Sequence, residues 1–217
     1  MNKKQYAVRC ALYLLGVIVL ALGIVLNTKT QLGVSPIISI PNNIAVIWNW
    51  NLGAVTFLFY TLCVGMEFLL AYKKCSVFTL LQIPMSLVTS CFINFFNQRL
   101  NFDTSTYTMR FLVLAAAIVI TGIGAATMVN MQMIPNPADA LANVIGQKIH
   151  RDMGFGKNVF DISCFTISCI IGLLFVHRIV GIGAGTVIAV ILTGRVIALF
   201  NRLFKKNMQR AAGIAVS

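Results

Sequence analysis

Charged side chains are scarce in this sequence, and acidic ones are the scarcest. Only 10% of the 217 residues are charged and five are acidic, whereas a soluble domain carries about 25% charged residues. Hydrophobic residues reach 59%, which excludes an ordinary cytosolic domain and a disordered chain. The 17 Lys and Arg residues give a net charge of +12, but they are scattered between long apolar runs. This pattern indicates an integral membrane protein in a lipid bilayer, with no nucleic-acid partner.

Histidine and paired cysteine are also lacking. The only two histidines are His150 and His177, and the six cysteines occur singly, five of them inside apolar runs. Without a CxxC pair or a Cys/His cluster, we expect no metal site, no disulfide framework and no cofactor. The chain has no Walker A motif, no GxSxG, no zincin HExxH helix and no Ser/His/Asp set. We therefore expect that the protein is not an enzyme.

Six apolar runs are long enough to cross a bilayer, which takes about 20 residues per helix. They are residues 10–28, 52–72, 75–97, 111–134, 158–176 and 179–201. Basic residues precede the first run, but no small-residue cleavage site follows it. We therefore expect the first run to be an uncleaved helix.

Two further segments, residues 35–50 and 138–149, are helix-like but too short and too polar to span comfortably. Each follows a helix-start signal, because Ser35-Pro36 and Asn136-Pro137 place a capping residue before a proline at the first helical position. We predict two half-helices that dip into the membrane or lie buried against the other helices. Irregular backbone at that depth is tolerated only where protein or water covers it.

Basic residues predict the orientation. With six spans both termini lie inside, and twelve Lys and Arg residues face the inside against four outside. The inner set is Lys3, Lys4, Arg9, Lys73, Lys74, Lys148, Arg151, Lys157, Arg202, Lys205, Lys206 and Arg210, and the outer set is Lys29, Arg99, Arg110 and Arg178. Eight spans give the same ratio, since Arg99 and Arg110 then exchange sides with Lys73 and Lys74. The length and polarity of the short segments favour six.

The chain repeats itself at offsets of 101 to 104 residues. Matched pairs are Gly23 and Gly124, Gln31 and Gln132, Pro36 and Pro137, Asn42 and Asn143, Gly53 and Gly156, and Thr89 and Thr193. We predict two membrane repeats, residues 1–100 and 108–210, that form a single all-α membrane domain. Three spans per half make the repeat inverted, and four would make it parallel. Inverted repeats with broken helices are typical of small-solute transporters.

Three segments resemble a known family. They are LLGVIVLALGIVLNTKTQLGVSP, its echo IVITGIGAATMVNMQMIPNPADALANVIG, and GIGAGTVIAVILTGRVIALF near the end. Their glycine-proline pattern is similar to that of the YczE/YyaS/YitT-type bacterial multi-pass membrane proteins. The resemblance covers most of the chain and implies a bacterial plasma membrane, but it supplies no substrate. The family's proline-aspartate turn is kept by Pro137 and Asp139, whereas Ile37 and Ile38 follow Pro36.

Charges inside spans cost about 2.5–3.5 kcal/mol each and suggest function. Asp161 has two interpretations: a surface pair with Lys157 one turn away, or a cavity carboxylate that faces Arg195. We expect Arg195 to be buried against a carboxylate, Asp161 first and Asp139 second, because an unpaired guanidinium at that depth is expensive.

A solute site is expected where the two half-helices begin. Inverted symmetry brings these starts together near the bundle centre, where N–H groups and amides bind a small anionic or zwitterionic molecule. The candidate substrate-binding residues are Gln31, Ser35, Asn42, Gln132, Asn136, Asp139, Asn143, Asp161 and Arg195. Asp139 is equally explained as a helix cap. If Ser35 leaves the first half-helix uncapped, its N–H groups are free for an anionic group.

These features favour a transporter or permease that moves a small polar solute by alternating access. One alternative is a membrane-embedded substrate-binding subunit of a larger machine. A second is an accessory or regulatory membrane protein without transport activity.

Three other features have structural interpretations. Glu67 is expected to snorkel or to pair with Lys73 or Lys74. A stripe of small residues, Gly181, Gly185, Ala189 and Thr193, predicts close helix packing within the chain or in a homodimer. Trp48 and Trp50 are typical of the membrane interface.

Overall fold

The structure, a computed structural model, describes residues 3–71, 77–101, 104–151 and 153–214, and these residues form eight helices and no strand. Six helices are long: α1 (Lys3–Lys29), α3 (Leu52–Ala71), α4 (Val77–Arg99), α5 (Tyr107–Asn130), α7 (Met153–Val176) and α8 (Ala184–Ala211). Two are short: α2 (Pro36–Trp48) and α6 (Pro137–Lys148). The expected all-helical class and the division into long and short helices are confirmed.

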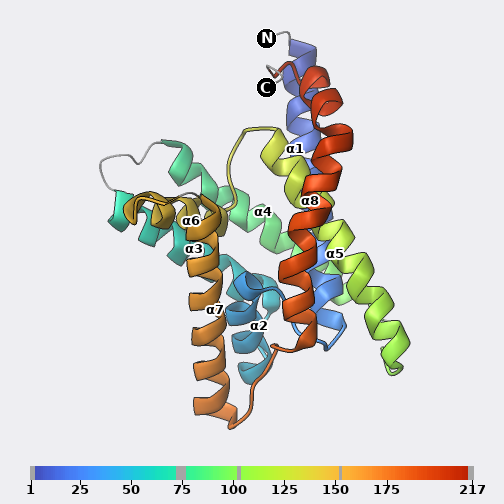
Figure 1. The fold of residues 1–217 in the computed structure, drawn as a ribbon, viewed down its shortest axis with the longest axis vertical. Helices are drawn as coiled ribbons and strands as arrows, with labels where there is room; N and C mark the ends of the chain where they lie inside the picture. The colour runs from blue at the N-terminus through green and yellow to red at the C-terminus, as the bar shows by residue number, and fades with distance from the viewer. Residues whose placement is uncertain (1–2, 72–76, 102–103, 152, 215–217) are drawn as a thin grey trace.

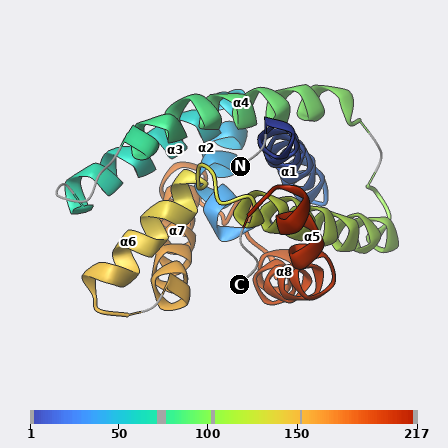
Figure 2. The ribbon, with the colours of Figure 1, turned by 90° about the horizontal axis from the view of Figure 1, so that it is seen from above.

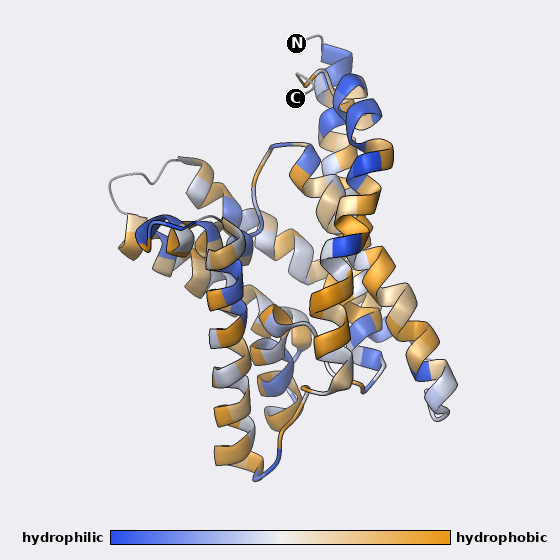
Figure 3. Cartoon of the chain, viewed as in Figure 1, coloured by the Kyte–Doolittle hydropathy of each residue, from blue (hydrophilic) through white to orange (hydrophobic). Residues whose placement is uncertain are grey.

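Length and hydropathy separate the two kinds of helix. The six long helices are each long and apolar enough to cross a membrane. With 13 and 12 residues, α2 and α6 extend only about 20 Å and 18 Å, well short of a hydrocarbon core of about 30 Å. Hydrophilic residues gather at the ends of α1 and α8 beside the termini, and hydrophobic residues run along α5 and α7 (Figure 3).

The short helices start and stop by the same local chemistry. Each has its proline in the first turn, where the missing N–H breaks no helical hydrogen bond. Each is followed by a residue in the left-handed region, Asn49 (φ 52°) and His150 (φ 55°). The next N–H then bonds back into the helix, Trp50 to the Ala45 oxygen and Arg151 to the Gly146 oxygen. This reversal is a common way for helices to end.

Several long helices extend beyond their predicted ranges, as α1 and α7 do by starting at Lys3 and Met153, and two stop well short of a predicted bound. α5 ends at Asn130, and Gln132 (φ 48°) turns the chain where the prediction continued the helix to residue 134. α8 starts at Ala184 and not at residue 179, because Gly181 adopts a φ of +68° that ordinary helix excludes. Gly181 is therefore not part of the predicted stripe. Of the rest of that stripe, Gly185 packs within the chain against Leu32 and Ala189 is buried, whereas Thr193 is partly exposed.

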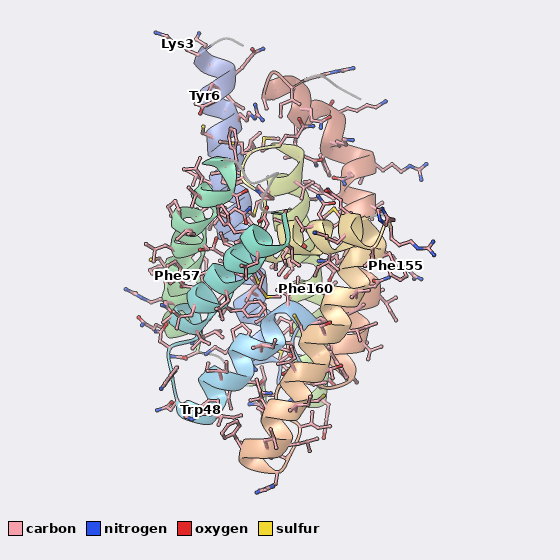
Figure 4. The ribbon with its side chains drawn as sticks, turned by 90° about the vertical axis from the view of Figure 1, so that its left-hand side faces the viewer. Lys3, Tyr6, Trp48, Phe57, Phe155 and Phe160 are labelled. Carbon is pink, nitrogen blue, oxygen red and sulfur yellow. The ribbon has the colours of Figure 1, made fainter. Side chains whose placement is uncertain are left out.

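Both termini lie at the same end of the bundle (Figure 1), and Gly213 packs against Gln5 there. α6 lies nearer this end, which we call the terminal end, and α2 lies nearer the opposite end (Figure 1). Lys3 and Trp48 mark these two ends (Figure 4). The two Trp side chains are 40% and 59% exposed, as expected for residues that face an interface.

The helices form two groups. In the first, α1 packs against α4 and α5, and α8 packs against α5; in the second, α2 and α6 each pack against both α3 and α7. α3 packs along α4, and this contact joins the two groups. Among the described residues, α7 and α8 do not pack along each other. Seen from above, α6 and α7 lie on one side and α5 and α8 on the other (Figure 2).

Helix α1 crosses α5 antiparallel at glycines. A Cβ atom added to Gly23 would lie 2.6 Å from the Thr121 nitrogen, and one added to Gly124 would lie 2.7 Å from the Leu20 Cα. Only glycine permits so close an approach of two backbones.

Helix α2 runs in the same direction as α7. The Asn43 amide donates to the backbone oxygen and the hydroxyl of Ser168, at 2.6 and 2.9 Å. One turn earlier, the Ser39 hydroxyl donates to the Cys164 oxygen at 3.4 Å. Both pairs are 125 residues apart, so the two helices keep one register along their contact.

Candidate functional site

A cavity of about 700 Å³ lies between the two groups of helices. It is lined by the starts of both short helices and by residues of α1, α3, α5, α7 and α8. At the end near α2 the lining residues Val34, Ile38 and Ala189 are buried. At the terminal end the lining residues Gln132, Met153 and Asn158 are exposed. The cavity is therefore closed at a floor near α2. It is open at a rim near the termini and along α8, where the lining residues Val190 and Gly194 are also exposed.

Most of the lining is apolar, with polar groups at a few places. The polar or charged side chains of the lining are Asn27, Ser35, Tyr60, Glu67, Thr121, Gln132, Asn136, Asp139, Asn143, Lys157, Asn158, Asp161 and Thr193. An apolar cavity with a few placed polar groups is the usual form of a small-molecule site. In the described residues, no group of three His, Cys, Asp or Glu side chains is placed to hold a metal ion.

One wall of the cavity carries an ion pair and an unpaired carboxylate. The Lys157 ammonium lies 2.6 Å from Asp139 Oδ1, and the two side chains are 40% and 30% exposed. Asp161, one helical turn after Lys157, has a buried Oδ1 with no hydrogen-bond partner among the described residues. The predicted surface pair of Asp161 and Lys157 is therefore replaced by a pair between α6 and α7. Asp161 is left with a buried acceptor that needs a donor.

The two short helices differ at their starts. Asn136 caps α6, since its side-chain oxygen accepts from the Ala138 N–H at 3.0 Å, and its amide nitrogen donates to the Tyr60 hydroxyl at 3.4 Å. Asp139 adds a carboxylate to the first turn of the same helix. Ser35 precedes α2 in extended conformation, but its side chain makes no capping bond. Pro36 has no N–H and the Ile38 N–H donates to the Ser35 oxygen at 3.0 Å, so the start of α2 keeps the Ile37 N–H and its partial positive charge.

Two further polar groups of the lining lack partners. Asn27, near the end of α1, is 6% exposed, and its amide oxygen has no hydrogen-bond partner among the described residues. The Thr121 hydroxyl of α5 is likewise buried and unpartnered there. A polar group left unpaired in an apolar site is costly, so such groups are rare and often mark a place for water or a ligand.

The turns that lead into the short helices are held differently. At the floor, the Val34 N–H donates to the Gly181 oxygen at 2.9 Å, and the Gly185 N–H donates to the Leu32 oxygen at 2.8 Å. At the terminal end, Arg9 donates to the Met131 and Gln132 oxygens at 2.7 and 2.6 Å, and the Tyr13 hydroxyl donates to the Ile134 oxygen at 2.9 Å. The floor turn is thus tied to the start of α8, and the other turn to α1.

The structure brings six of the predicted site residues to the cavity: Ser35, Gln132, Asn136, Asp139, Asn143 and Asp161. Three do not line it. Gln31 is exposed in the turn after α1. Asn42 is buried on α2 beside Gly181. The third, Arg195, requires a correction.

The prediction that Arg195 is buried against a carboxylate is wrong. Its side chain is exposed, on an apolar surface between α5 and α8, and it forms no ion pair with Asp161 or Asp139. Depth along a helix does not decide which face a residue takes, and this face of α8 points away from the cavity. Long basic side chains at such positions reach toward the headgroups.

Glu67 has a partner on α4 that was not predicted. Its carboxylate accepts a hydrogen bond from the Gln82 amide of α4 at 2.9 Å. Its predicted partners, Lys73 and Lys74, lie outside the described residues. The bond to Gln82 satisfies a carboxylate that is only 9% exposed.

Residue patterns missed Asn27, Tyr60, Thr121 and Lys157 as parts of the site. Lys157 entered only as a neighbour of Asp161. The other three are single polar residues in apolar runs, where the only signal is that each is an isolated hydrogen-bonding group in a span.

Comparisons with known proteins agree with the sequence patterns. A family described as a family of unknown function (DUF6198) matches residues 7–202. The chain is 26% identical over 198 residues to "Uncharacterized membrane protein YczE" of Bacillus subtilis (strain 168), which covers 90% of this chain and 86% of the relative. The resemblance noted from the glycine-proline pattern is thereby confirmed. No solved structure matches.

Proposed function

Since the chain belongs to the DUF6198 family of multi-pass membrane proteins, we propose that it is a transporter in the bacterial cell membrane. In this proposal it moves a small polar solute, anionic or zwitterionic, by alternating access between two inverted halves, residues 1–100 and 108–210. Both termini are cytoplasmic, and the protein has neither enzymatic activity nor a cofactor. One observation carries the proposal: the cavity between the starts of the two short helices is closed on one side and open on the other.

Equivalent contacts support the inverted repeat. An inverted repeat at offset 101 exchanges Leu20 with Thr121 and Gly23 with Gly124. The contact of Gly124 with Leu20 then becomes the contact of Gly23 with Thr121, and both are present with similar geometry. A second pair of contacts that the repeat exchanges joins α1 to α4 and α5 to α8. The Lys29 ammonium donates to the Asn97 oxygen at 3.2 Å, and the Asn130 amide donates to Asn201 at 2.8 Å.

Departures from this symmetry support alternating access. On the floor side, Gly53 of α3 packs on α4, where its N–H donates to Asn94 at 2.8 Å and its oxygen accepts from Ser90. The repeat offsets make Gly156 and Gly194 the counterparts of Gly53 and Ser90. Gly194 is instead open, since a Cβ added there would meet nothing within 4 Å. The contact of α3 with α4 thus closes the floor side, and the corresponding contact of α7 with α8 is open on the other side. This is expected for one of the two states between which a transporter alternates.

The charges of the lining favour a zwitterion over an anion. Three carboxylates, Glu67, Asp139 and Asp161, line the cavity with one ammonium, Lys157. A purely anionic solute would meet an excess of negative charge in a poorly solvated cavity, which costs free energy at short distance. A zwitterion presents a positive group to these carboxylates.

The test is uptake into proteoliposomes by the purified protein alone. In a chain whose six native cysteines are replaced, Leu32→Cys and Gly185→Cys are paired across the floor. The Leu32 Cβ lies 2.9 Å from a Cβ added at Gly185, so a small shift permits a disulfide. We expect oxidation to abolish uptake and a reductant to restore it, because the floor must open for solute to leave. The matched control is Leu32→Cys alone, which oxidation leaves active.

Three results would refute the proposal. Uptake that continues with the floor cross-linked would refute alternating access through this cavity. Ligand binding without uptake by the protein alone would favour the substrate-binding subunit. Absence of both binding and uptake would favour the accessory or regulatory protein.

A further inference from the structure

We propose that the cavity is a site for an α-amino acid with an apolar side chain. Its carboxylate lies at the uncapped start of α2 between Asn27 and Thr121, and its ammonium group lies on Asp161. The inference rests on the proposed function in placing the ligand in the same cavity, and it adds the ligand class and the residues for each end.

The carboxylate end is built from donors, and α2 has no acidic residue in its own first turn. α2 has 13 residues, and its start carries the positive end of the helix dipole. Pro36 has no N–H and the Ile38 N–H donates to the Ser35 oxygen at 3.0 Å, so the N–H offered to a ligand there is that of Ile37. The side chain that precedes it, Ser35, leaves that end uncapped and lines the cavity. Asn27 adds a side-chain amide that is 94% buried, and its oxygen has no partner among the described residues. Because that oxygen is an acceptor, the amide binds a carboxylate by turning its nitrogen toward the ligand. The Thr121 hydroxyl is a second free donor.

The other short helix offers no such place. The Asn136 side chain already accepts from the first turn of α6, and the Asp139 carboxylate occupies the same positive end. A second carboxylate there would be repelled. The cavity therefore has one anion-binding end, near the floor.

The ligand's ammonium group binds at the carboxylate that has no ion-pair partner in the protein. Lys157 neutralises Asp139 at 2.6 Å, whereas Asp161 Oδ1 is buried without a donor among the described residues. A ligand ammonium has three N–H donors and a positive charge, so it supplies both the hydrogen bond and the counter-charge.

The spacing of the two ends selects an α-amino acid. Ser39 contacts Cys164 and Asn43 contacts Ser168, both 125 residues apart. The same register, extended three residues from Cys164 toward the start of α7, sets Asp161 beside Pro36, in the first turn of α2. The groups that hold the two charges are therefore neighbours. In an α-amino acid the amino and carboxyl groups are joined through one carbon, with bonds of about 1.5 Å, and so are neighbours as well.

The remaining lining fits an apolar side chain. Leu20 and Ile24 of α1, Met128 of α5 and Val190 of α8 face the cavity around the two polar ends. Burial of an aliphatic side chain against them supplies affinity, with about 0.8 kcal/mol for each buried CH₂.

The experiment measures the melting temperature of the detergent-purified protein with alanine, valine, leucine, isoleucine, methionine and phenylalanine. For the amino acid with the largest shift, it adds the amine that lacks the carboxylate and the acid that lacks the amino group. We expect the amino acid to raise the Tm, and each truncated analogue to need at least a tenfold higher concentration for the same shift.

Variants then separate the two ends. Asp161→Asn weakens binding of the amino acid at least tenfold but leaves binding of the truncated acid unchanged. Asn27→Leu and Thr121→Val weaken binding of the amino acid but not of the truncated amine. The matched control is Ser163→Ala on the exposed face of α7, outside the cavity lining, which leaves both unchanged.

The inference is overturned if none of the six amino acids shifts the Tm, if a truncated analogue binds as well as the amino acid, or if Asp161→Asn leaves its binding unchanged. Binding as described without uptake into liposomes would refute transport and keep this site. Uptake of a solute that is not a zwitterion would refute this site and keep transport.

Discussion

The close crossing of α1 and α5 gives the sharpest test of the packing. Replacing Gly23 by Ala adds a methyl group 2.6 Å from the Thr121 nitrogen and 2.9 Å from its Cα, and Gly124→Ala adds one 2.7 Å from the Leu20 Cα. Carbon atoms in ordinary contact are about 3.5–4.0 Å apart. Because the neighbours are backbone atoms and cannot rotate away, the two helices must separate by about 1 Å.

The net effect is the difference of two terms. Overpacking a tight contact costs about 1–3 kcal/mol, and alanine gains about 1 kcal/mol over glycine in a helix. Since the helices must move as wholes, we expect the upper end of the cost and a net loss of about 2 kcal/mol for each variant. The double variant should lose less than the sum of the two, because both changes relax the same crossing.

The assay is thermal unfolding in detergent, with Gly65→Ala as the matched control. Gly65 lies within α3, and a Cβ added there meets nothing within 4 Å, so this variant should be as stable as the parent or up to about 1 kcal/mol more stable. The reasoning fails if Gly23→Ala and Gly124→Ala melt like the parent. It also fails if Gly65→Ala loses as much stability as they do.

Three further changes have defined outcomes. Asp139→Asn removes a partly exposed ion pair and should lower stability by at most about 1 kcal/mol. Lys157 is then free to pair with another carboxylate, and this should weaken amino-acid binding measured by titration calorimetry. Arg195→Leu should leave the Tm unchanged or raise it, because the side chain is exposed without an ion pair; a clear fall in Tm would show a hidden partner. Tyr13→Phe removes the hydrogen bond to the Ile134 oxygen, which should cost about 1 kcal/mol and increase protease cleavage in the turn before α6.

Local chemistry made the helices predictable. Apolar runs of sufficient length identified the long helices, and a capping residue before Pro36 or Pro137 located the starts of the short ones. Helix ends were harder, because Gly181 and Gln132 end or delay a helix through a backbone conformation that an apolar run does not reveal. The predicted offset between the halves paired positions along the chain, but it did not show which of them face the same cavity.

The site was predictable where position along the chain decides it, and not where rotation of a helix decides it. Asn136 and Asp139 line the cavity because they belong to the first turn of α6. Asn42 and Asn143 were paired by the predicted repeat, yet α2 turns Asn42 toward Gly181 while Asn143 faces the cavity. Asn27 and Thr121 join the site only through the crossing of α1 with α5, a contact between distant segments that the sequence pattern does not contain.

The contact between α2 and α7 also sets an order of events during synthesis. Asn43 finds its partner Ser168 only 125 residues later, which at about 5–20 residues per second takes roughly 6–25 s. Until then the Asn43 amide is a polar group without that partner in a helix too short to cross the bilayer, and its exposure to lipid would be costly. We therefore expect α2 to wait at the membrane surface while the ribosome completes α7, and to enter its place between α3 and α7 as one of the last steps of assembly.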